Sequence, residues 1–315
     1  METEKLIFEV PDFALSFRVK LLRDKNPALV AKVLAELPLE TVLHHVLFSG
    51  RAIYMPTKIV DNESGNMVTR KLGDVYLYQP SAQICITYNS LTPESAPVNK
   101  FAEVIEEDLP TLIKLGELVR QQTVESAQRK IIVMKVRNPT SEVRLTHSRT
   151  TGNTTPRIGA WRRAVEELDR EINRVWLEEP EEIKALRQAN TSPPTLFFLN
   201  SYLLQDGPNI GSKLLAMAED TEMTLPLMLR MTRQFFTQPF DHFLFLADLG
   251  LPRMKEIGET YLDALSSLES LHDYRELTRP LVILLNRMQK WLHLIYDHGG
   301  LKQDEKIEVA KARAV

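Results

Sequence analysis

Residues 74–89 read Asp-Val-Tyr-Leu-Tyr-Gln-Pro-Ser-Ala-Gln-Ile-Cys-Ile-Thr-Tyr-Asn, and this stretch decides the fold of the first half of the chain. It holds two short apolar runs, Asp74–Tyr78 and Gln83–Asn89, which are separated by the breaker Gln79–Ala82. Runs of roughly four to eight apolar and aromatic residues between turn-forming residues are typical of β-strands. We therefore expect two short strands here.

Similar runs surround this stretch and extend the β region over the first 110 residues. Apolar residues alternate in Leu6–Val10 and Ala14–Leu21, and further β-like segments lie at Thr41–Met55 and Lys100–Ile105. One helix is expected at Ala28–Leu37, where apolar residues recur at helical spacing. Strands this short and this regularly interrupted favour a small closed barrel over a doubly wound sheet.

The second half of the chain has a helical pattern. A helical stretch at Leu109–Ala127 and a β-like run at Lys130–Val136 come first, and the polar residues 138–159 then predict an exposed linker or lid. Prolines fall at or near the boundaries of the helices that follow. These helices are expected at Trp161–Leu177, Glu181–Gln188, Leu196–Leu204, Gly211–Glu219, Leu225–Phe236, His242–Ala247, Arg253–Leu268 and Arg279–Tyr296.

The predicted fold class is therefore α+β, with two domains. Residues 1–137 form a β-barrel domain, residues 138–159 the linker or lid, residues 160–300 an all-α helical bundle, and residues 301–315 a charged tail.

The composition limits the classes of function. The chain has 315 residues, with 39 Lys and Arg against 42 Asp and Glu, so it lacks the basic excess of a nucleic-acid-binding domain. No run approaches the roughly 18 apolar residues of a membrane span, and the acidic Met1–Lys5 does not suit a signal peptide. We expect a cytoplasmic protein with neither nucleic-acid nor membrane partners. The single cysteine, Cys85, excludes an intramolecular disulfide and a Cys-rich zinc site.

Two segments of the barrel region resemble the cyclophilin pattern. In cyclophilins a small-residue turn, a Gln and an apolar strand precede a strand that reads Phe-Gly-Lys-Val-Ile. Pro80–Thr87 is similar to the first part of this pattern. Asn99–Glu106, which follows a proline-containing loop, is similar to the second part. The upstream segments His45–Pro56 and Gly73–Tyr78 resemble a bacterial cyclophilin-like group. A cyclophilin-like barrel followed by a helical bundle is the domain order of the cucumopine/mikimopine synthases, and the chain resembles that family in architecture and length.

This resemblance implies an opine synthase that joins L-histidine to 2-oxoglutarate through an imine and a Pictet–Spengler-type cyclisation, without reduction. No Gly-x-Gly-x-x-Gly dinucleotide motif occurs in the sequence, which agrees with a reaction that needs no nicotinamide, and we expect no cofactor. We also expect no metal, because Asp241/His242 and Asp297/His298 are adjacent pairs without the spacing of ligands on one helix face.

Such substrates carry carboxylates, which cations and neutral donors bind. Arg51 is the first candidate for a bidentate contact, with Ser49 beside it, and Lys100 is the second. The alternative is that Arg51 and Lys100 are ordinary solvent-exposed cations at the surface.

Cyclisation also requires a base that titrates near neutral pH. His44 and His45 are adjacent, so on a strand they point to opposite faces. His45 is the candidate because it lies in the resembling segment, although a histidine bonded to a backbone carbonyl is as good an interpretation. Glu103 stands where cyclophilins usually carry Lys and is a second candidate base, or else an outward residue that balances Lys100.

Three tyrosines and a glutamine complete the candidate site. Tyr76 is a candidate for proton transfer, while Tyr78 and Tyr88 are candidates to orient a carboxylate or stack on the imidazole. Gln83 matches the glutamine that lines the cyclophilin ligand cleft. Tyrosines at period two also suit ordinary barrel packing, and Cys85 is expected to be a packed residue.

Two other functions stay open. A cyclophilin-like prolyl isomerase is one, although the sequence has no Phe-His-Arg segment, and a non-enzymatic small-molecule-binding module is the other. Residues 196–246 are rich in Met, Phe and Leu and predict bundle core; an exposed part of them would be a surface for homo-oligomers.

Overall fold

The structure is a computed structural model, and it describes residues 4–46, 50–89, 97–126, 129–139 and 159–295. The chain divides into two compact units, the first comprising residues 1–142 with 297–315 and the second residues 143–296. The division falls within the predicted linker 138–159. Most of that linker and all of the predicted tail 301–315 lie outside the described residues.

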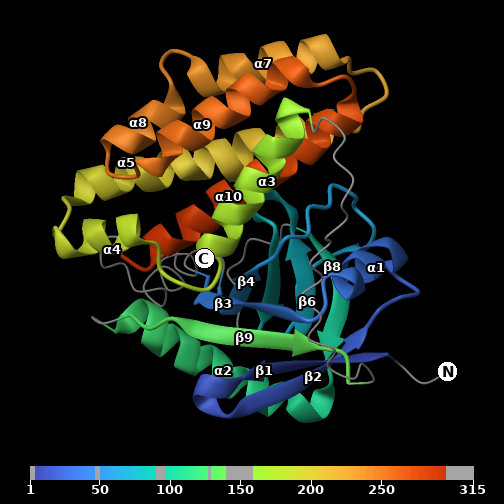
Figure 1. Cartoon of the computed structure of the whole chain (residues 1–315). Helices are drawn as coiled ribbons and strands as arrows, with labels where there is room; N and C mark the ends of the chain where they lie inside the picture. Colours follow the sequence, from blue (N-terminus) through green and yellow to red (C-terminus); the bar gives the residue numbers. More distant parts are fainter. Residues whose placement is uncertain (1–3, 47–49, 90–96, 127–128, 140–158, 296–315) are drawn as a thin grey trace, which may run out of the picture. The chain divides into compact units, whose positions relative to one another are not determined.

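The first unit is a closed barrel of antiparallel strands (Figure 1). Its strands are β1 Lys5–Val10, β2 Leu15–Leu21, β3 Leu39–His45, β4 Ala52–Pro56, β5 Met67–Val68, β6 Asp74–Tyr78, β7 Gln83–Thr87, β8 Val98–Val104 and β9 Ile132–Arg137. Eight of them follow the order β2-β1-β9-β3-β4-β7-β6-β8, and pairing of β2 with β8 closes the ring. The short β5 adds to the edge of β8. The predicted closed barrel is confirmed.

Alternation along each strand places one set of side chains in the barrel core. Val75 and Leu77 of β6, with Ile84 and Ile86 of β7, belong to one buried apolar cluster. Two helices, α1 Pro27–Ala35 and α2 Leu109–Arg120, contribute leucines and valines to the same cluster. The intervening residues of each strand therefore lie on the outer face of the barrel.

Helix α2 approaches the barrel closely at Gly116. A Cβ atom at this position would lie 2.3–2.4 Å from ring atoms of Tyr88, closer than any packed Cβ. Glycine is a poor helix former, but here its missing side chain makes room for the tyrosine ring. Gly116 thus sets the distance between α2 and the strand that precedes Tyr88.

The expected single β segment Thr41–Met55 is wrong in one respect, because it forms two antiparallel strands, β3 and β4. Gly50, between them, has φ +94°, a conformation that favours glycine. The two strands pair with His44 opposite Tyr54 and His45 opposite Ile53. This register determines which histidine faces the core.

The second unit is helical, as predicted. Its helices are α3 Ala160–Arg174, α4 Glu181–Gln188, α5 Pro193–Leu204, α6 Ser212–Met217, α7 Leu225–Thr237, α8 His242–Asp248, α9 Arg253–Ala264 and α10 Leu271–His293. Helix α10 packs against α3 and α5 and is buried along most of its length. The expected start of this helix at Arg279 is wrong, because the helix begins eight residues earlier at Leu271, with Ser270 as its N-cap, and Pro280 lies inside it. Proline at that point removes one N–H donor without ending the helix.

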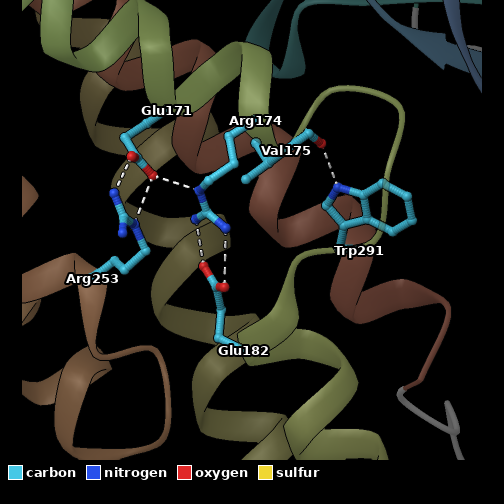
Figure 2. A network of polar contacts seen from close by, with 6 residues as sticks. All are labelled: Glu171, Arg174, Val175, Glu182, Arg253 and Trp291. Carbon is cyan, nitrogen blue, oxygen red and sulfur yellow. Dashed lines mark hydrogen bonds and ion pairs between the residues drawn. The ribbon is translucent and has the colours of Figure 1, made fainter.

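A polar network joins four helices of this unit (Figure 2). The buried carboxylate of Glu171 on α3 accepts hydrogen bonds from Arg174 and from Arg253 of α9. Arg174 also donates to both carboxylate oxygens of Glu182 on α4, at 2.7 and 3.2 Å. Nε1 of Trp291 on α10 donates to the carbonyl of Val175 at 2.7 Å. Because the buried charge is paired on both sides, burial of Glu171 does not leave an isolated carboxylate.

Candidate active site

One row of side chains crosses five neighbouring strands on the outer face of the barrel. The strand registers place His44 opposite Tyr54, Tyr54 opposite Cys85, Cys85 opposite Tyr76, and Tyr76 opposite Lys100. We call these five residues the polar row. It runs over β3, β4, β7, β6 and β8, of which Figure 1 labels all but β7.

The polar row is buried although it lies outside the barrel core. His44, Tyr54, Cys85 and Tyr76 are 2–5% exposed, and the side chain of Lys100 is 15% exposed. The rings of His44 and Tyr54 stack with centroids 5.2 Å apart. Aromatic rings and polar tips in a buried setting are typical of ligand sites.

Strand β7 carries two buried polar atoms on this same face. Gln83 and Thr87 flank Cys85 along the strand and are 5% and 0% exposed. Among the residues that the structure describes, Nε2 of Gln83 and Oγ1 of Thr87 have no hydrogen-bond partner. Most buried polar groups in proteins are paired, and leaving one unpaired costs about 1–3 kcal/mol. A bound polar molecule would supply the missing partners.

Tyr76 lies at the centre of the polar row and is held as a neutral phenol. Burial raises the pKa of Tyr76, and the nearby Cys85 raises it further. A hydrogen bond and the charge of Arg70 act in the opposite direction but do not cancel burial. Tyr76 is therefore a hydrogen-bond donor at neutral pH, and Arg70, 9% exposed, is a cation beside it.

Lys100 ends the polar row in a charged cluster. Its Nζ lies 2.6 Å from Oδ1 of Asp74 and 3.0 Å from Oε2 of Glu103. Burial favours the neutral amine, but hydrogen bonds to Asp74 and Glu103 outweigh it, so the pKa of Lys100 is raised. Lys100 stays charged at neutral pH, which opposes a role as an amine nucleophile, and a substrate carboxylate at its ammonium would compete with Asp74 and Glu103. The Glu103 side chain is 38% exposed and also lies 3.8 Å from Lys20.

His45 and Tyr88 lie on the core side of the sheet, apart from the polar row. Nδ1 of His45 lies 2.6 Å from the Val46 carbonyl, which can only accept, so Nδ1 carries the proton. Nε2 then accepts a hydrogen bond from the Tyr88 hydroxyl at 2.7 Å. Burial lowers the pKa of His45 to about 4, and burial raises that of Tyr88. Both ring nitrogens of His45 thus have partners within the barrel.

Arg51 lies at the edge of this interior pair. Its Nη1 donates to both carboxylate oxygens of Glu117 on α2, at 2.7 and 2.9 Å. The Arg51 guanidinium also donates a hydrogen bond to the Tyr88 hydroxyl. A substrate carboxylate at Arg51 would compete with Glu117.

The predicted site residues therefore separate into groups. Tyr76, Lys100, Gln83 and Glu103 belong to the outer face, whereas His45, Tyr88 and Arg51 form the interior group. Tyr78 lies opposite Gln83 but is 47% exposed. Ser49 lies outside the described residues. The expected packed position of Cys85 agrees with its 4% exposure.

Sequence reasoning missed His44, Tyr54, Arg70 and Asp74. His44 and Tyr54 lie on either side of Ser49-Gly50 in the segment Thr41–Met55, which is expected as one β-like segment, so their pairing across two strands was not predicted. The period-two pattern of β4 places Tyr54 on the face opposite Ile53 and Met55, and this signal is present in the sequence. Arg70 lies outside the nine strands, and only the folded chain brings it to Tyr76.

Within the described ranges, no group of three or more His, Cys, Asp or Glu side chains is placed to hold a metal ion. The helices in those ranges include none that is long and apolar enough to cross a membrane.

Comparison with known proteins adds to this geometry. Residues 161–295 match the family model of the cucumopine synthase C-terminal helical bundle domain. The structure of McbB in complex with tryptophan is similar over 98% of this chain and 99% of McbB, with a TM-score of 0.80 and 22% sequence identity. Curated proteins show no match in sequence.

Two smaller solved structures resemble part of the chain. A hypothetical protein from Archaeoglobus fulgidus covers 43% of this chain and 95% of its own length, with 19% identity and a TM-score of 0.32. The Mimivirus cyclophilin covers 44% of this chain and 88% of its own length, with 12% identity and a TM-score of 0.27.

The likeness to McbB extends over both units, so the barrel followed by a helical bundle is a fold that the two proteins share. The family model matches the helical unit alone, so residues 161–295 belong to the family of the cucumopine synthase C-terminal helical bundle domain.

Proposed function

We propose that the outer face of the barrel is the active site of a Pictet–Spengler-type opine synthase that acts on L-histidine and 2-oxoglutarate. The histidine amine condenses with the ketone to an imine and releases water. A carbon of the imidazole ring then attacks the imine carbon, the new C–C bond closes a ring, and the ring carbon loses a proton to a base. No hydride is transferred, so the reaction needs no nicotinamide.

The observation that carries this proposal is the pair of buried polar atoms on β7. Gln83 Nε2 and Thr87 Oγ1 lack partners among the described residues and flank a row that contains Tyr54 and Tyr76. A planar ring between tyrosines, with polar groups toward Gln83 and Thr87, would satisfy both the aromatic and the polar surfaces. An amino acid with a heteroaromatic side chain has this combination.

Two cations are suited to the substrate carboxylates. Arg70 has a planar guanidinium that can bind a carboxylate with two hydrogen bonds, and it lies at Tyr76. Lys100 is the second cation, and a substrate carboxylate there would have to displace Asp74 or Glu103. The Tyr76 hydroxyl, which is neutral, can donate a hydrogen bond to the same carboxylate or to the imine nitrogen.

His44 is the histidine on this face and the one we propose as the base. Its ring stacks on Tyr54 in the polar row, whereas His45 is engaged with Tyr88 and Val46 inside the barrel. Imidazole is the side chain that most often acts as a general base in enzymes. Glu103 stays an alternative base, since its carboxylate lies within reach of the Lys100 end of the row.

The likeness to McbB supports an amino acid as one substrate. That structure holds tryptophan, an amino acid with a heteroaromatic ring and a free amine. The match of the bundle to the cucumopine synthase family supports the opine branch of the chemistry.

The test is direct. Purified protein is incubated with L-histidine and 2-oxoglutarate without NAD(P)H, and mass spectrometry looks for a product lighter by one water than the sum of the substrates. We expect this product from the wild type and from Gln188→Leu, a change at an exposed residue of α4, and a strong decrease with Gln83→Leu. Turnover of a prolyl peptide in place of this product would indicate the isomerase, and no reaction in either assay would contradict an enzymatic role.

A second pair of variants separates the two histidines. Loss of kcat in His44→Gln supports the base assigned here. Loss of kcat confined to His45→Gln would return that role to the barrel interior. Circular dichroism of both variants checks that each one is folded.

A further inference from the structure

Strand β7 holds three side chains in line on the outer face of the barrel. Gln83, Cys85 and Thr87 alternate with Ile84 and Ile86, which belong to the barrel core. Each residue advances about 3.3 Å along a strand, so the α-carbons of Gln83 and Thr87 lie about 13 Å apart. The atoms that lack a partner among the described residues, Nε2 of Gln83 and Oγ1 of Thr87, therefore lie at the two ends of this line.

The two atoms differ in what they can bind. Nε2 of Gln83 is an amide nitrogen, which only donates, whereas Oγ1 of Thr87 both donates and accepts. The ammonium of an amino acid has three N–H donors and no acceptor, so of these two atoms only Oγ1 of Thr87 can bind it. Asp74 lies beside Thr87 in the register of β6 with β7, and its carboxylate contacts Lys100 of the polar row. The Thr87 end of the line therefore suits the substrate amine.

The Gln83 end suits a neutral ring nitrogen. Gln83 lies between Pro56 of β4 and Tyr78 of β6, neither of which is charged at neutral pH. A neutral imidazole has one N–H donor and one acceptor nitrogen, whereas indole has the N–H donor alone. Nε2 of Gln83 can therefore donate to an imidazole ring but finds no acceptor nitrogen on an indole. In the proposed function the substrate carboxylate has a partner of its own, Arg70 beside Tyr76.

The length of this line fits one amino acid with a ring side chain. The α-amine of histidine lies about 6 Å from the far ring nitrogen when the side chain is extended, given bonds of about 1.4–1.5 Å. A hydrogen bond of about 3 Å at each end brings this span to about 12 Å. Side chains stand roughly perpendicular to a sheet, so the polar atoms of Gln83 and Thr87 keep about the 13 Å separation of their α-carbons. A single substrate molecule can therefore reach both residues.

We propose that β7 binds the amino-acid substrate lengthwise, with the amine at Thr87 and the ring at Gln83, and that Gln83 selects a ring with an acceptor nitrogen. This inference rests on the proposed function and assigns one end of the substrate to each residue. A ring without an acceptor leaves the buried Nε2 of Gln83 unpaired in the complex, as it is without ligand. The affinity for such a ring should be about five- to hundredfold lower than for imidazole. Gln83 is thus the residue that determines specificity for the ring.

Calorimetric titration of the full chain with three ligands tests the proposal. The ligands are L-histidine, thienyl-L-alanine, whose five-membered ring has no nitrogen, and imidazolepropionate, which lacks the amine. We expect the wild type to bind both analogues about five- to hundredfold more weakly than L-histidine. Gln83→Leu should lose affinity for L-histidine but not for thienyl-L-alanine, and Thr87→Val should lose affinity for L-histidine but not for imidazolepropionate. A Gln83→Leu variant that keeps the wild-type preference for imidazole, or a Thr87→Val variant that weakens L-histidine and imidazolepropionate equally, would overturn the assignment.

Controls separate this inference from the proposed function. Gln188→Leu and Thr221→Val make the same chemical changes at exposed residues of the helical unit and should bind all three ligands as the wild type does. The comparison of ligands in the wild type needs no substitution, and circular dichroism checks that each variant is folded. If the wild type forms the product from L-histidine and 2-oxoglutarate but binds thienyl-L-alanine equally well, the selection by Gln83 is wrong and the proposed function stands. If the wild type does not bind L-histidine, both are wrong.

Discussion

Nε2 of His45 accepts a hydrogen bond from the hydroxyl of Tyr88 at 2.7 Å, inside the barrel. The proton on Nδ1 goes to the Val46 carbonyl, so the pair forms a chain of two hydrogen bonds with a defined tautomer. Tyr88 is 0% exposed and packs on Gly116 of α2. The pair therefore links β3 to the residue that follows β7, next to α2, through buried polar groups.

Removing the tyrosine hydroxyl should destabilise the protein. In Tyr88→Phe the buried Nε2 of His45 loses its donor, and an unsatisfied buried acceptor costs about 1–3 kcal/mol. We expect the free energy of unfolding in urea to fall by about that amount. Tyr78→Phe, at a residue 47% exposed, should change the same quantity by less than about 0.5 kcal/mol. Equal effects of the two changes would contradict the hydrogen bond.

The depressed pKa of His45 should make stability depend on pH. The unfolded chain binds a proton at His45 below about 6.5, whereas the folded chain binds it only near 4. Between these values the unfolded state holds more protons, so stability is present above 6.5 and is lost as the pH falls toward 4. The contribution is on the order of 3 kcal/mol.

The variant His45→Gln isolates this contribution. Other groups titrate in both proteins, so the difference between their curves of unfolding free energy against pH belongs to His45. We expect the wild type to lose more stability than His45→Gln between pH 6.5 and 4. Parallel curves would show that His45 is not buried in its neutral form.

Arg70 should determine the affinity for a carboxylate substrate. If it binds that carboxylate beside Tyr76, Arg70→Ala loses charge-assisted hydrogen bonds worth about 1.5–3 kcal/mol. KM should then rise about ten- to hundredfold, measured by initial rates of product formation. Arg137→Ala is the matched control, because Arg137 is paired with Glu9 at the surface. An unchanged KM in Arg70→Ala would remove Arg70 from the site.

Gly116→Ala should destabilise the barrel, against the usual trend in helices. Replacing Gly by Ala in a helix normally stabilises by about 0.4–1 kcal/mol. Here the new Cβ would lie 2.3–2.4 Å from the Tyr88 ring, so the helix or the ring must move. We expect a lower free energy of unfolding, and a smaller loss when the same change is made in a Tyr88→Ala background. A stabilised Gly116→Ala would contradict the close contact.

Local sequence predicts much of the barrel. Asp74–Tyr78 forms the strand expected of it, and Gln83 begins the next strand after the breaker at 79–82, because turn residues and short apolar runs act locally. Ser49-Gly50 marks the break between β3 and β4 in the sequence, but the β-like residues on both sides were expected as one segment, so the pairing of the two strands was not predicted. The start of α10 was hidden by Pro280, which usually marks a helix end.

By itself, the sequence determined that alternate residues of each strand face opposite sides, that one cysteine is present, and that a barrel precedes a bundle. Only the tertiary structure decided which of two adjacent histidines joins Tyr54 and Tyr76, and that Arg70 lies at the same place. The physical reason is that alternation along a strand divides its side chains between two faces but does not determine which face is buried. Pairing between distant strands, such as β2 with β8, assigns those faces.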